Sequence, residues 1–331
     1  MQYIKPKLNI RADGNSEIGL GHIVRCISLA HMLKEDFKIS FFCLSIPASI
    51  KQEIEKEGWT VYPLTSVKEF EEYLSGSEVA ILDGYQFDSE YQKRMKEKAG
   101  KLVYIDDFHN QYMYADLVIN HAPGVSKEQY EGEPYTKYLL GADYALLRPE
   151  FLNNERTSTK EINEIKRLFI CFGGADFKNL TTKVIEWLPQ NGYEVIVVTG
   201  NAYKYHEELN KIISRRNDLS VEIKSSLSAG EMAKEMSKAD IGIVPSSGIL
   251  FEATAKKLPV ISGYYTENQI SIYKGFLSRK VFIDVKDFSE EIFRRSFDKL
   301  RVDLLKSICD NQKAVIDGKS PSRLKKEFLE I

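Results

Sequence analysis

The sequence alternates short apolar segments with longer amphipathic ones, and this alternation most constrains the fold. In the first half of the chain the apolar segments are residues 8–13, 39–44, 79–83, 101–106 and 115–120. Each segment has the length of a β-strand and lacks the polar alternation of a strand with one face in water. Such segments are typical of parallel strands buried between layers of helices, so the pattern predicts an α/β fold.

A second series of apolar segments follows residues 152–165, a polar and charged stretch with almost no large apolar side chains. Its segments are residues 167–173, 193–200, 219–225, 239–245 and 258–263. The length of 331 residues suits two domains. We therefore expect an N-terminal domain over 1–151, a linker over 152–165 and a C-terminal domain over 166–331. We also expect the two domains to face each other across a cleft that holds a ligand.

Composition excludes several classes of protein. The chain has 46 Lys plus Arg and 48 Asp plus Glu, a balance that gives no electrostatic signature of a nucleic-acid or membrane-surface partner. The longest apolar run, residues 39–46, is far shorter than the roughly 20 residues that span a bilayer. The four cysteines form no CxxC motif, and the N-terminal residues show no signal-peptide pattern. These features predict a cytoplasmic enzyme with reduced cysteines, and no nucleic-acid or membrane partner.

The first motif is RADGNSEIGLGHIVRC at residues 11–26. Its glycines, among them Gly19 and Gly21, allow the backbone to approach a ligand closely. His22 follows at the start of a predicted helix, whose positive end disfavours the imidazolium form. We therefore expect a neutral His22 that acts as a general base, although capping of the helix is the simpler alternative. The glycine spacing differs from GxGxxG, which disfavours a nicotinamide, and we expect no cofactor.

Three polar residues follow predicted strands of the first half. Asp13 is the last residue of the segment 8–13, Asp83 is the last residue of the segment 79–83, and Tyr85 follows two residues later. Because the carboxyl ends of parallel strands lie at one edge of a sheet, we expect these side chains near His22. Asp13 and Asp83 are the other candidates for a base.

Asp106, Asp107 and His109 follow the next strand. One interpretation is a metal site, and the other is hydrogen bonding that anchors loops around the site. A hard cation needs more oxygen ligands than this cluster offers, so we expect no metal.

The C-terminal half carries a third motif, PSSGILFEATAKKLPVI at residues 245–261. Ser246, Ser247 and Gly248 precede a predicted helix, and their hydroxyls and free backbone N–H groups suit a diphosphate. Glu252 lies about one turn into that helix, where a carboxylate can accept both hydroxyls of a ribose. The alternative is a capped helix with a solvated glutamate.

Two further loops supply candidate ligand contacts. Gly173 and Gly174 follow a predicted strand and form a second loop of close approach. Asn268 and Gln269 can each donate and accept hydrogen bonds near a polar ligand.

These motifs resemble one enzyme family. In order, they are RADGNSEIGLGHIVRC, LDGYQFD, YIDDFH, ADLVINH, LLGADYALLRPEF, CFGGADFKNLT, ADIGIVPSSGILFEA and ENQ. From about residue 8 to about residue 285 the chain resembles the UDP-2,4-diacetamido-2,4,6-trideoxy-β-L-altropyranose hydrolases of pseudaminic acid biosynthesis. The resemblance implies the GT-B fold, with two Rossmann-like domains whose parallel sheets face a cleft.

The resemblance also implies roles for individual residues. His22 matches the family's catalytic base, Tyr85 matches an active-site tyrosine, and Asn268 matches an asparagine that binds the nucleotide sugar. The chain departs from the family at Gly84, where family members often have histidine, and we expect a wider sugar pocket there. The residues that match the diphosphate and ribose region are Ser246, Ser247 and Glu252.

The hypothesis is therefore a metal-independent hydrolase that cleaves a UDP-linked 2,4-diacetamido-2,4,6-trideoxyhexose to UDP and free sugar, with inversion. Two alternatives stay open. One is a GT-B glycosyltransferase that uses the same donor, and the other is a nucleotide-sugar-binding protein without catalysis.

Overall fold

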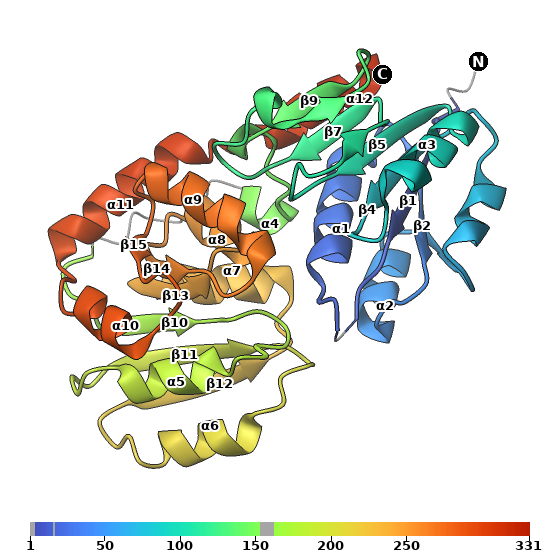
Figure 1. The fold of residues 1–331 in the computed structure, drawn as a ribbon. Coiled ribbons are helices and arrows are strands. Elements are labelled where there is room, and N and C mark those ends of the chain that lie inside the picture. The colour runs from blue at the N-terminus through green and yellow to red at the C-terminus, as the bar shows by residue number, and fades with distance from the viewer. Residues whose placement is uncertain (1–3, 16, 153–161) are drawn as a thin grey trace. The chain divides into compact units, whose positions relative to one another are not determined.

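The computed structural model describes residues 4–15, 17–152 and 162–331. The chain forms two compact units, which are described separately below (Figure 1). Unit 1 comprises Met1–Arg148 and Lys319–Ile331, and unit 2 comprises Pro149–Gly318. Of the predicted linker, residues 153–161 lie outside the described residues.

Unit 1 is built on a seven-stranded sheet in the order β3-β2-β1-β4-β5-β7-β9, with every neighbouring pair parallel. The strands are β1 (Lys7–Ala12), β2 (Lys38–Cys43), β3 (Thr60–Pro63), β4 (Val79–Asp83), β5 (Lys101–Ile105), β7 (Leu117–Asn120) and β9 (Lys137–Leu140). The helices are α1 (Gly21–Leu33), α2 (Ala48–Lys56), α3 (Ser89–Lys98) and α12 (Ser320–Glu330). Two short strands, β6 (Tyr112–Met113) and β8 (Glu131–Gly132), pair apart from the main sheet. Short 3₁₀ helices are at Lys68–Tyr73, Lys127–Gln129 and Ala142–Tyr144.

The central strands of unit 1 are buried on both faces. Ile81 of β4 packs in the apolar cluster that includes residues of α1, whereas Ala80 and Leu82 pack in a second cluster that includes Met95 of α3. Successive side chains of a strand point to opposite faces, so a strand with helices on both sides has no solvated face. This packing explains the uninterrupted apolar runs in the sequence.

The C-terminal helix α12 belongs to unit 1, whereas the sequence predicted a C-terminal domain over 166–331. Leu324 and Phe328 are buried in the same cluster as Phe37, and the rings of Phe37 and Phe328 are 6.3 Å apart. Lys325 Nζ also lies 2.8 Å from Asp36 Oδ2. This segment is mostly basic and polar, but Leu324 and Phe328 lie four residues apart on one face of the helix. Two apolar residues at this spacing are enough to bury that face.

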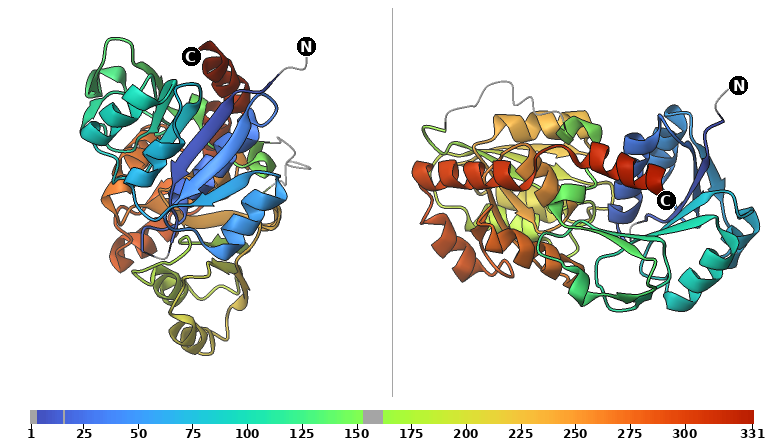
Figure 2. Two further views of the ribbon diagram at one scale, coloured as in Figure 1. Left: turned by 90° about the vertical axis from the view of Figure 1, so that its right-hand side faces the viewer. Right: turned by 90° about the horizontal axis from the view of Figure 1, so that it is seen from above.

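Unit 2 contains a six-stranded parallel sheet in the order β12-β11-β10-β13-β14-β15. Its strands are β10 (Arg167–Ile170), β11 (Glu194–Thr199), β12 (Ser220–Ser225), β13 (Ile241–Pro245), β14 (Val260–Gly263) and β15 (Ile283–Asp284). Its helices are α4 (Pro149–Leu152), α5 (Leu180–Trp187), α6 (His206–Ile213), α7 (Ala229–Lys238), α8 (Gly248–Ala255), α9 (Ile270–Ser278), α10 (Glu290–Phe297) and α11 (Val302–Val315), with a 3₁₀ turn at Glu267–Gln269. Figure 2 shows helices along the sheet of each unit from two further sides.

Strand order identifies the edge of each sheet where a ligand is expected. In unit 1 β1 lies between β2 and β4, and in unit 2 β10 lies between β11 and β13. Later strands of each unit are added first on one side of this strand and then on its other side, so the order of strand addition reverses here. In open α/β sheets, ligands bind beyond the carboxyl ends of the strands at such a switch point. Among the described residues, no helix combines the length and apolarity that crossing a bilayer requires.

Candidate functional site

His22 and Asp83 form a buried pair at the switch point of unit 1. His22 is the second residue of α1, just after the loop that leaves β1, and Asp83 is the last residue of β4. His22 Nδ1 lies 2.7 Å from Asp83 Oδ1. His22 is 7% exposed and Asp83 is fully buried. The pairing of β1 with β4 in the sheet therefore holds two residues together that are 61 positions apart.

Asp83 is held in its ionised form. Burial acts to raise the pKa of Asp83, but the charge of Arg25 and the interaction with His22 outweigh it, so the pKa lies well below its usual range. An ionised carboxylate accepts hydrogen bonds only, so it selects the tautomer of His22 whose proton is on Nδ1. The other ring nitrogen, Nε2, then has a lone pair with which it can accept a proton.

Arg25 joins this pair to a second carboxylate. Its Nε and one terminal nitrogen donate to the two oxygens of Asp83 at 2.7 and 2.6 Å. Its terminal nitrogens also donate to the two oxygens of Asp107 at 2.6 and 3.1 Å. Burial acts to raise the pKa of Asp107, but Arg25 lowers it below its usual value. The sequence analysis missed Arg25, and its spacing of three residues from His22 on one helix was the available signal.

Tyr85 lies beside His22, as the sequence predicted. Its ring meets the imidazole edge-on at 4.6 Å between centroids, and its hydroxyl donates to Asp107 Oδ2 at 3.0 Å. The side chain is 48% exposed. The structure therefore brings together His22, Asp83 and Tyr85, the three residues proposed as catalytic, with Tyr85 the member most accessible to a substrate.

The space next to Gly84 is occupied. A Cβ atom placed on Gly84 would lie 2.5 Å from Gln86 Oε1 and 2.9 Å from Gln86 Nε2. Gln86 Nε2 in turn donates to Asp13 Oδ2 at 3.2 Å. The missing side chain at position 84 thus leaves room that the Gln86 amide fills, rather than the wider pocket that the sequence suggested.

Asp13 mainly ties loops together. Its Oδ1 accepts from the backbone N–H groups of Leu44 and Ser45 at 2.6 and 3.1 Å. Its Oδ2 lies 2.8 Å from a guanidinium nitrogen of the fully buried Arg11. With both oxygens engaged, Asp13 is a poorer candidate for the base than His22.

The glycines before α1 shape the loop. Gly19 has φ of 80°, in the region that favours glycine, and it pairs with Asn15 in a short bridge. Gly21 begins α1, and an added Cβ there would meet no atom within 4 Å, so close packing does not require this glycine. An approaching ligand remains the reason proposed for it.

At the alternative metal site after β5, one oxygen of Asp106 and both oxygens of Asp107 are engaged. Asp106 Oδ2 accepts from the backbone N–H of His109 at 2.7 Å and from the hydroxyl of Tyr130 at 2.8 Å, while Asp107 is bound by Arg25. Within the described ranges, no three His, Cys, Asp or Glu side chains gather as ligands for a metal ion.

In unit 2 the corresponding edge presents hydroxyls and backbone groups. Ser246 is buried, and its Oγ lies 3.0 Å from Ser262 Oγ on the adjacent strand. Ser247 is the N-cap of α8, with no side-chain cap there, and Gly248 is exposed in the first turn. The N-terminus of a helix attracts anions through its N–H groups and its dipole. Glu252 lies one turn further along α8 and is 8% exposed, so it is not a solvated glutamate.

The loops after β10 and β14 flank this helix terminus. Gly173 has φ of 83°, and a Cβ on Gly200 would lie 2.5 Å from Gly174 Cα, so the loops after β10 and β11 touch through their backbones. After β14, Gln269 Oε1 accepts from the backbone N–H of Tyr265 at 2.9 Å. Asn268 Oδ1 accepts from the hydroxyl of Thr266 at 2.6 Å and is half-buried.

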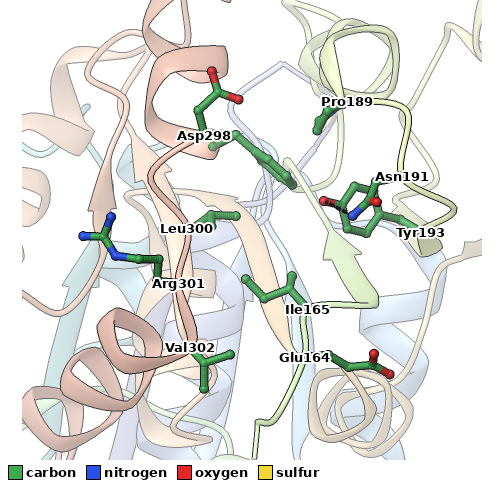
Figure 3. A pocket seen from close by; sticks show the side chains of 10 residues that line it. Glu164, Ile165, Pro189, Asn191, Tyr193, Asp298, Leu300, Arg301 and Val302 are labelled. Carbon is green, nitrogen blue, oxygen red and sulfur yellow. Dashed lines mark hydrogen bonds between the residues drawn. The ribbon is translucent and has the colours of Figure 1, made fainter.

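Two cavities lie away from these groups. One of about 450 Å³ in unit 2 is lined by residues that precede β10 and β11, including Ile165 and Tyr193, and by Arg301 (Figure 3). Another of about 380 Å³ in unit 1 is lined by Val79 and Lys101, at the amino ends of β4 and β5. Both are at the opposite strand ends from the polar clusters, so we assign the site from its chemistry and from the strand order.

Comparison with curated proteins identifies relatives over most of the chain, whereas no protein-family model matches it. An uncharacterized protein of Methanocaldococcus jannaschii is 31% identical over 286 residues, which are 82% of this chain and 58% of that protein. The UDP-2,4-diacetamido-2,4,6-trideoxy-beta-L-altropyranose hydrolase of Campylobacter jejuni is 28% identical over 273 residues, 80% of this chain and 94% of that enzyme. The spore coat polysaccharide biosynthesis protein SpsG of Bacillus subtilis is 27% identical over 84% of this chain and 83% of that protein. The resemblance to the hydrolases is confirmed, and the chain spans 58% of the length of its archaeal relative.

Solved structures establish the fold. The crystal structure of Acinetobacter baumannii MurG matches with a TM-score of 0.70 over 99% of this chain and all of that chain, at 11% identity. Anabaena HepE, solved in complex with UDP and glucose, matches with a TM-score of 0.61 over 98% of each chain, at 12% identity. The predicted GT-B fold is therefore confirmed.

Proposed function

We propose that this protein is a metal-independent hydrolase that cleaves a UDP-linked 2,4-diacetamido-2,4,6-trideoxyhexose to UDP and the free sugar. The observation that carries the proposal is the contact of 2.7 Å between His22 Nδ1 and the buried Asp83 carboxylate at the switch point of unit 1. The similarity to the Campylobacter jejuni hydrolase supports the choice of substrate.

His22 acts as the general base. Asp83 accepts the hydrogen bond from Nδ1–H and orients the ring, and Nε2 takes a proton from water as the water oxygen attacks the anomeric carbon. The new C–O bond forms as the bond to the diphosphate oxygen breaks, and that oxygen keeps the electron pair. Attack from the face opposite UDP inverts the anomeric carbon.

Unit 2 binds the nucleotide. The first turn of α8, with Ser246, Ser247 and Gly248, takes the diphosphate, and its N–H groups stabilise the charge that develops on the leaving group. Glu252 accepts the ribose hydroxyls. Asn268 and Gln269 from the loop after β14, with Gly173 and Gly174 after β10, complete the nucleotide-sugar contacts.

The test is UDP release without an acceptor. The protein is incubated with the UDP-linked diacetamido-trideoxyhexose, or with UDP-GlcNAc as a comparison, and UDP and the anomeric configuration of the free sugar are measured. We expect UDP and inverted sugar from the diacetamido substrate. Release that requires an added acceptor would instead identify a glycosyltransferase, the activity associated with the GT-B fold. Binding without turnover under both conditions would identify a nucleotide-sugar-binding protein.

A further inference from the structure

Arg25 supplies a positive charge in direct contact with the His22–Asp83 pair. Its guanidinium contacts both oxygens of Asp83 and both oxygens of Asp107. With neutral His22, the cluster holds one positive and two negative charges. Uptake of one proton by His22 would make the cluster neutral.

Cys26, His121 and Tyr85 also lie beside the cluster. Burial raises the pKa of the Cys26 thiol, which donates to Asp83 at 3.4 Å. His121, which follows β7, has a pKa lowered to about 4, mainly by burial and then by the charge of Arg25. The Tyr85 hydroxyl donates to Asp107. The charged side chains joined directly at this cluster are therefore Arg25, Asp83 and Asp107.

We propose that Arg25 and Asp107 are positioning residues that keep His22 neutral yet able to accept a proton. They do so because Arg25, Asp83 and Asp107 together have a net charge of −1, which one proton on His22 would neutralise. The inference rests on the proposed function and deepens it. Without Arg25 the two carboxylates would favour the imidazolium form of His22, and an imidazolium is no base. A neutral Arg25–Asp83 pair without Asp107 would attract the proton from water less strongly.

The geometry of Arg25 suits this task. A guanidinium presents several N–H donors in a planar fork and can bridge two carboxylates, whereas the ammonium of lysine is a point charge on a flexible stem. Asp107 also accepts the hydrogen bond of Tyr85, so the same carboxylate sets the charge at His22 and orients the exposed hydroxyl beside it.

The experiment compares Arg25→Gln, Asp107→Asn and the double variant with the unmodified protein. The ring resonances of His22 are titrated by NMR, assigned by their loss in His22→Gln, and kcat for UDP release is measured against pH. We expect the His22 titration and the acid limb of kcat to move up by about one pH unit in Arg25→Gln and down by about one unit in Asp107→Asn. The double variant restores the net charge and returns both to near their original positions.

Controls separate this role from support of the fold. Lys96→Gln removes a positive charge from the Lys96–Asp116 pair, which lies at the amino end of β7, and it should leave the His22 titration in place. Thermal melts and UDP affinity report folding. If Arg25→Gln does not fold, Asp107→Asn still tests the direction of the shift.

Shifts of the same sign in both single variants, or no shift in either, would overturn the proposal. The NMR titration needs no substrate, so it decides the role of Arg25 and Asp107 even if UDP-sugar hydrolysis is absent. Absent turnover in the unmodified protein with opposite NMR shifts would reject the proposed function alone.

Discussion

The edge formed by the carboxyl ends of the strands differs in chemistry between the two sheets of this protein. At the edge of unit 1, the buried Asp83 and the partly buried Arg25 are joined by charged hydrogen bonds. At the edge of unit 2, the candidate ligand groups of the α8 turn are hydroxyls and backbone N–H groups, with the buried Glu252 one turn behind them. The same parallel α/β architecture supports both edges.

The difference predicts separate roles for the two units, namely proton transfer in unit 1 and anion binding in unit 2. Ionised side chains in a buried cluster can move a proton, and their balance changes with pH. Hydroxyls and N–H groups at a helix terminus bind an anion with little change over the same pH range. We therefore expect substitutions in unit 1 to affect turnover and pH dependence, and substitutions in unit 2 to affect nucleotide affinity.

The largest effect is expected for His22→Ala. Loss of a general base typically lowers the rate by about two to four orders of magnitude, and the loss should appear in kcat because the base acts mainly in the transition state. UDP affinity should stay unchanged, since the groups assigned to UDP are in unit 2. Steady-state kinetics and calorimetry measure the two quantities, with a thermal melt as the control. Near-normal turnover by a folded variant would contradict the role of His22.

A smaller effect is expected on the pH dependence of the unfolding free energy, through the buried His121. Its pKa is lowered to about 4, and its Nδ1 accepts from the backbone N–H of Leu146 at 3.2 Å, a bond that protonation would break. The unfolded chain takes up this proton below about pH 6.5 and the folded protein only near pH 4, so stability falls as pH falls through that window.

Urea unfolding at pH 7 and pH 4.5 measures this contribution. We expect His121 to account for about 2 kcal/mol of the loss in unfolding free energy between these values. In His121→Asn the amide oxygen can still accept from the backbone N–H of Leu146. Between pH 7 and pH 4.5 the variant should therefore lose about 2 kcal/mol less unfolding free energy than the unmodified protein. An equal loss in both proteins would show that His121 is protonated in the folded state as readily as in the unfolded chain.

Glu252→Ala tests the other edge and should reduce UDP affinity about 10-fold, the cost of losing a charged hydrogen bond. Binding of uracil should change little, because only the ribose contact is removed. Glu222→Ala is the matched control, since Glu222 is an exposed glutamate of unit 2. Calorimetry with UDP and uracil measures both affinities. If both ligands weaken equally, or neither does, Glu252 is not the ribose ligand.

The smallest expected effect is that of a chelator on UDP binding. If the helix terminus and the hydroxyls of unit 2 neutralise the diphosphate, EDTA should leave the affinity unchanged. Calorimetry with and without EDTA measures it. Binding that disappears with EDTA and returns with Mg²⁺ would revive a metal at the diphosphate or at Asp106 and Asp107.

The sequence predicted the elements whose residues are buried on both faces. Strands such as β4 have uninterrupted apolar runs. β3 (Thr60–Pro63) and β9 (Lys137–Leu140) were missed. Val61 is the one buried residue of β3 and Leu139 that of β9, so neither edge strand needs an apolar run.

The candidate residues of unit 1 were predicted where they lie at a strand end or in the loop and first helical turn after a strand. The sequence placed His22, Asp83 and Tyr85 near one another because the carboxyl ends of parallel strands meet at one edge. Arg25 was missed, because an arginine in an amphipathic helix is usually solvated. Its burial depends on Asp83 and Asp107, which are 58 and 82 residues away in the chain. Such long-range partners leave no local pattern.

The packing of α12 bears on the order of folding. Unit 2 is continuous in sequence, whereas unit 1 is interrupted by the whole of unit 2. Leu324 and Phe328 complete the core of unit 1, so that core must close a loop of well over a hundred residues before it is finished. During synthesis, unit 2 can therefore reach its native state first. Until α12 is made, Phe37 of unit 1 lacks its contact with Phe328 and remains exposed to solvent. Nascent chains stalled before α12 should consequently expose apolar surface in unit 1 and engage chaperones there.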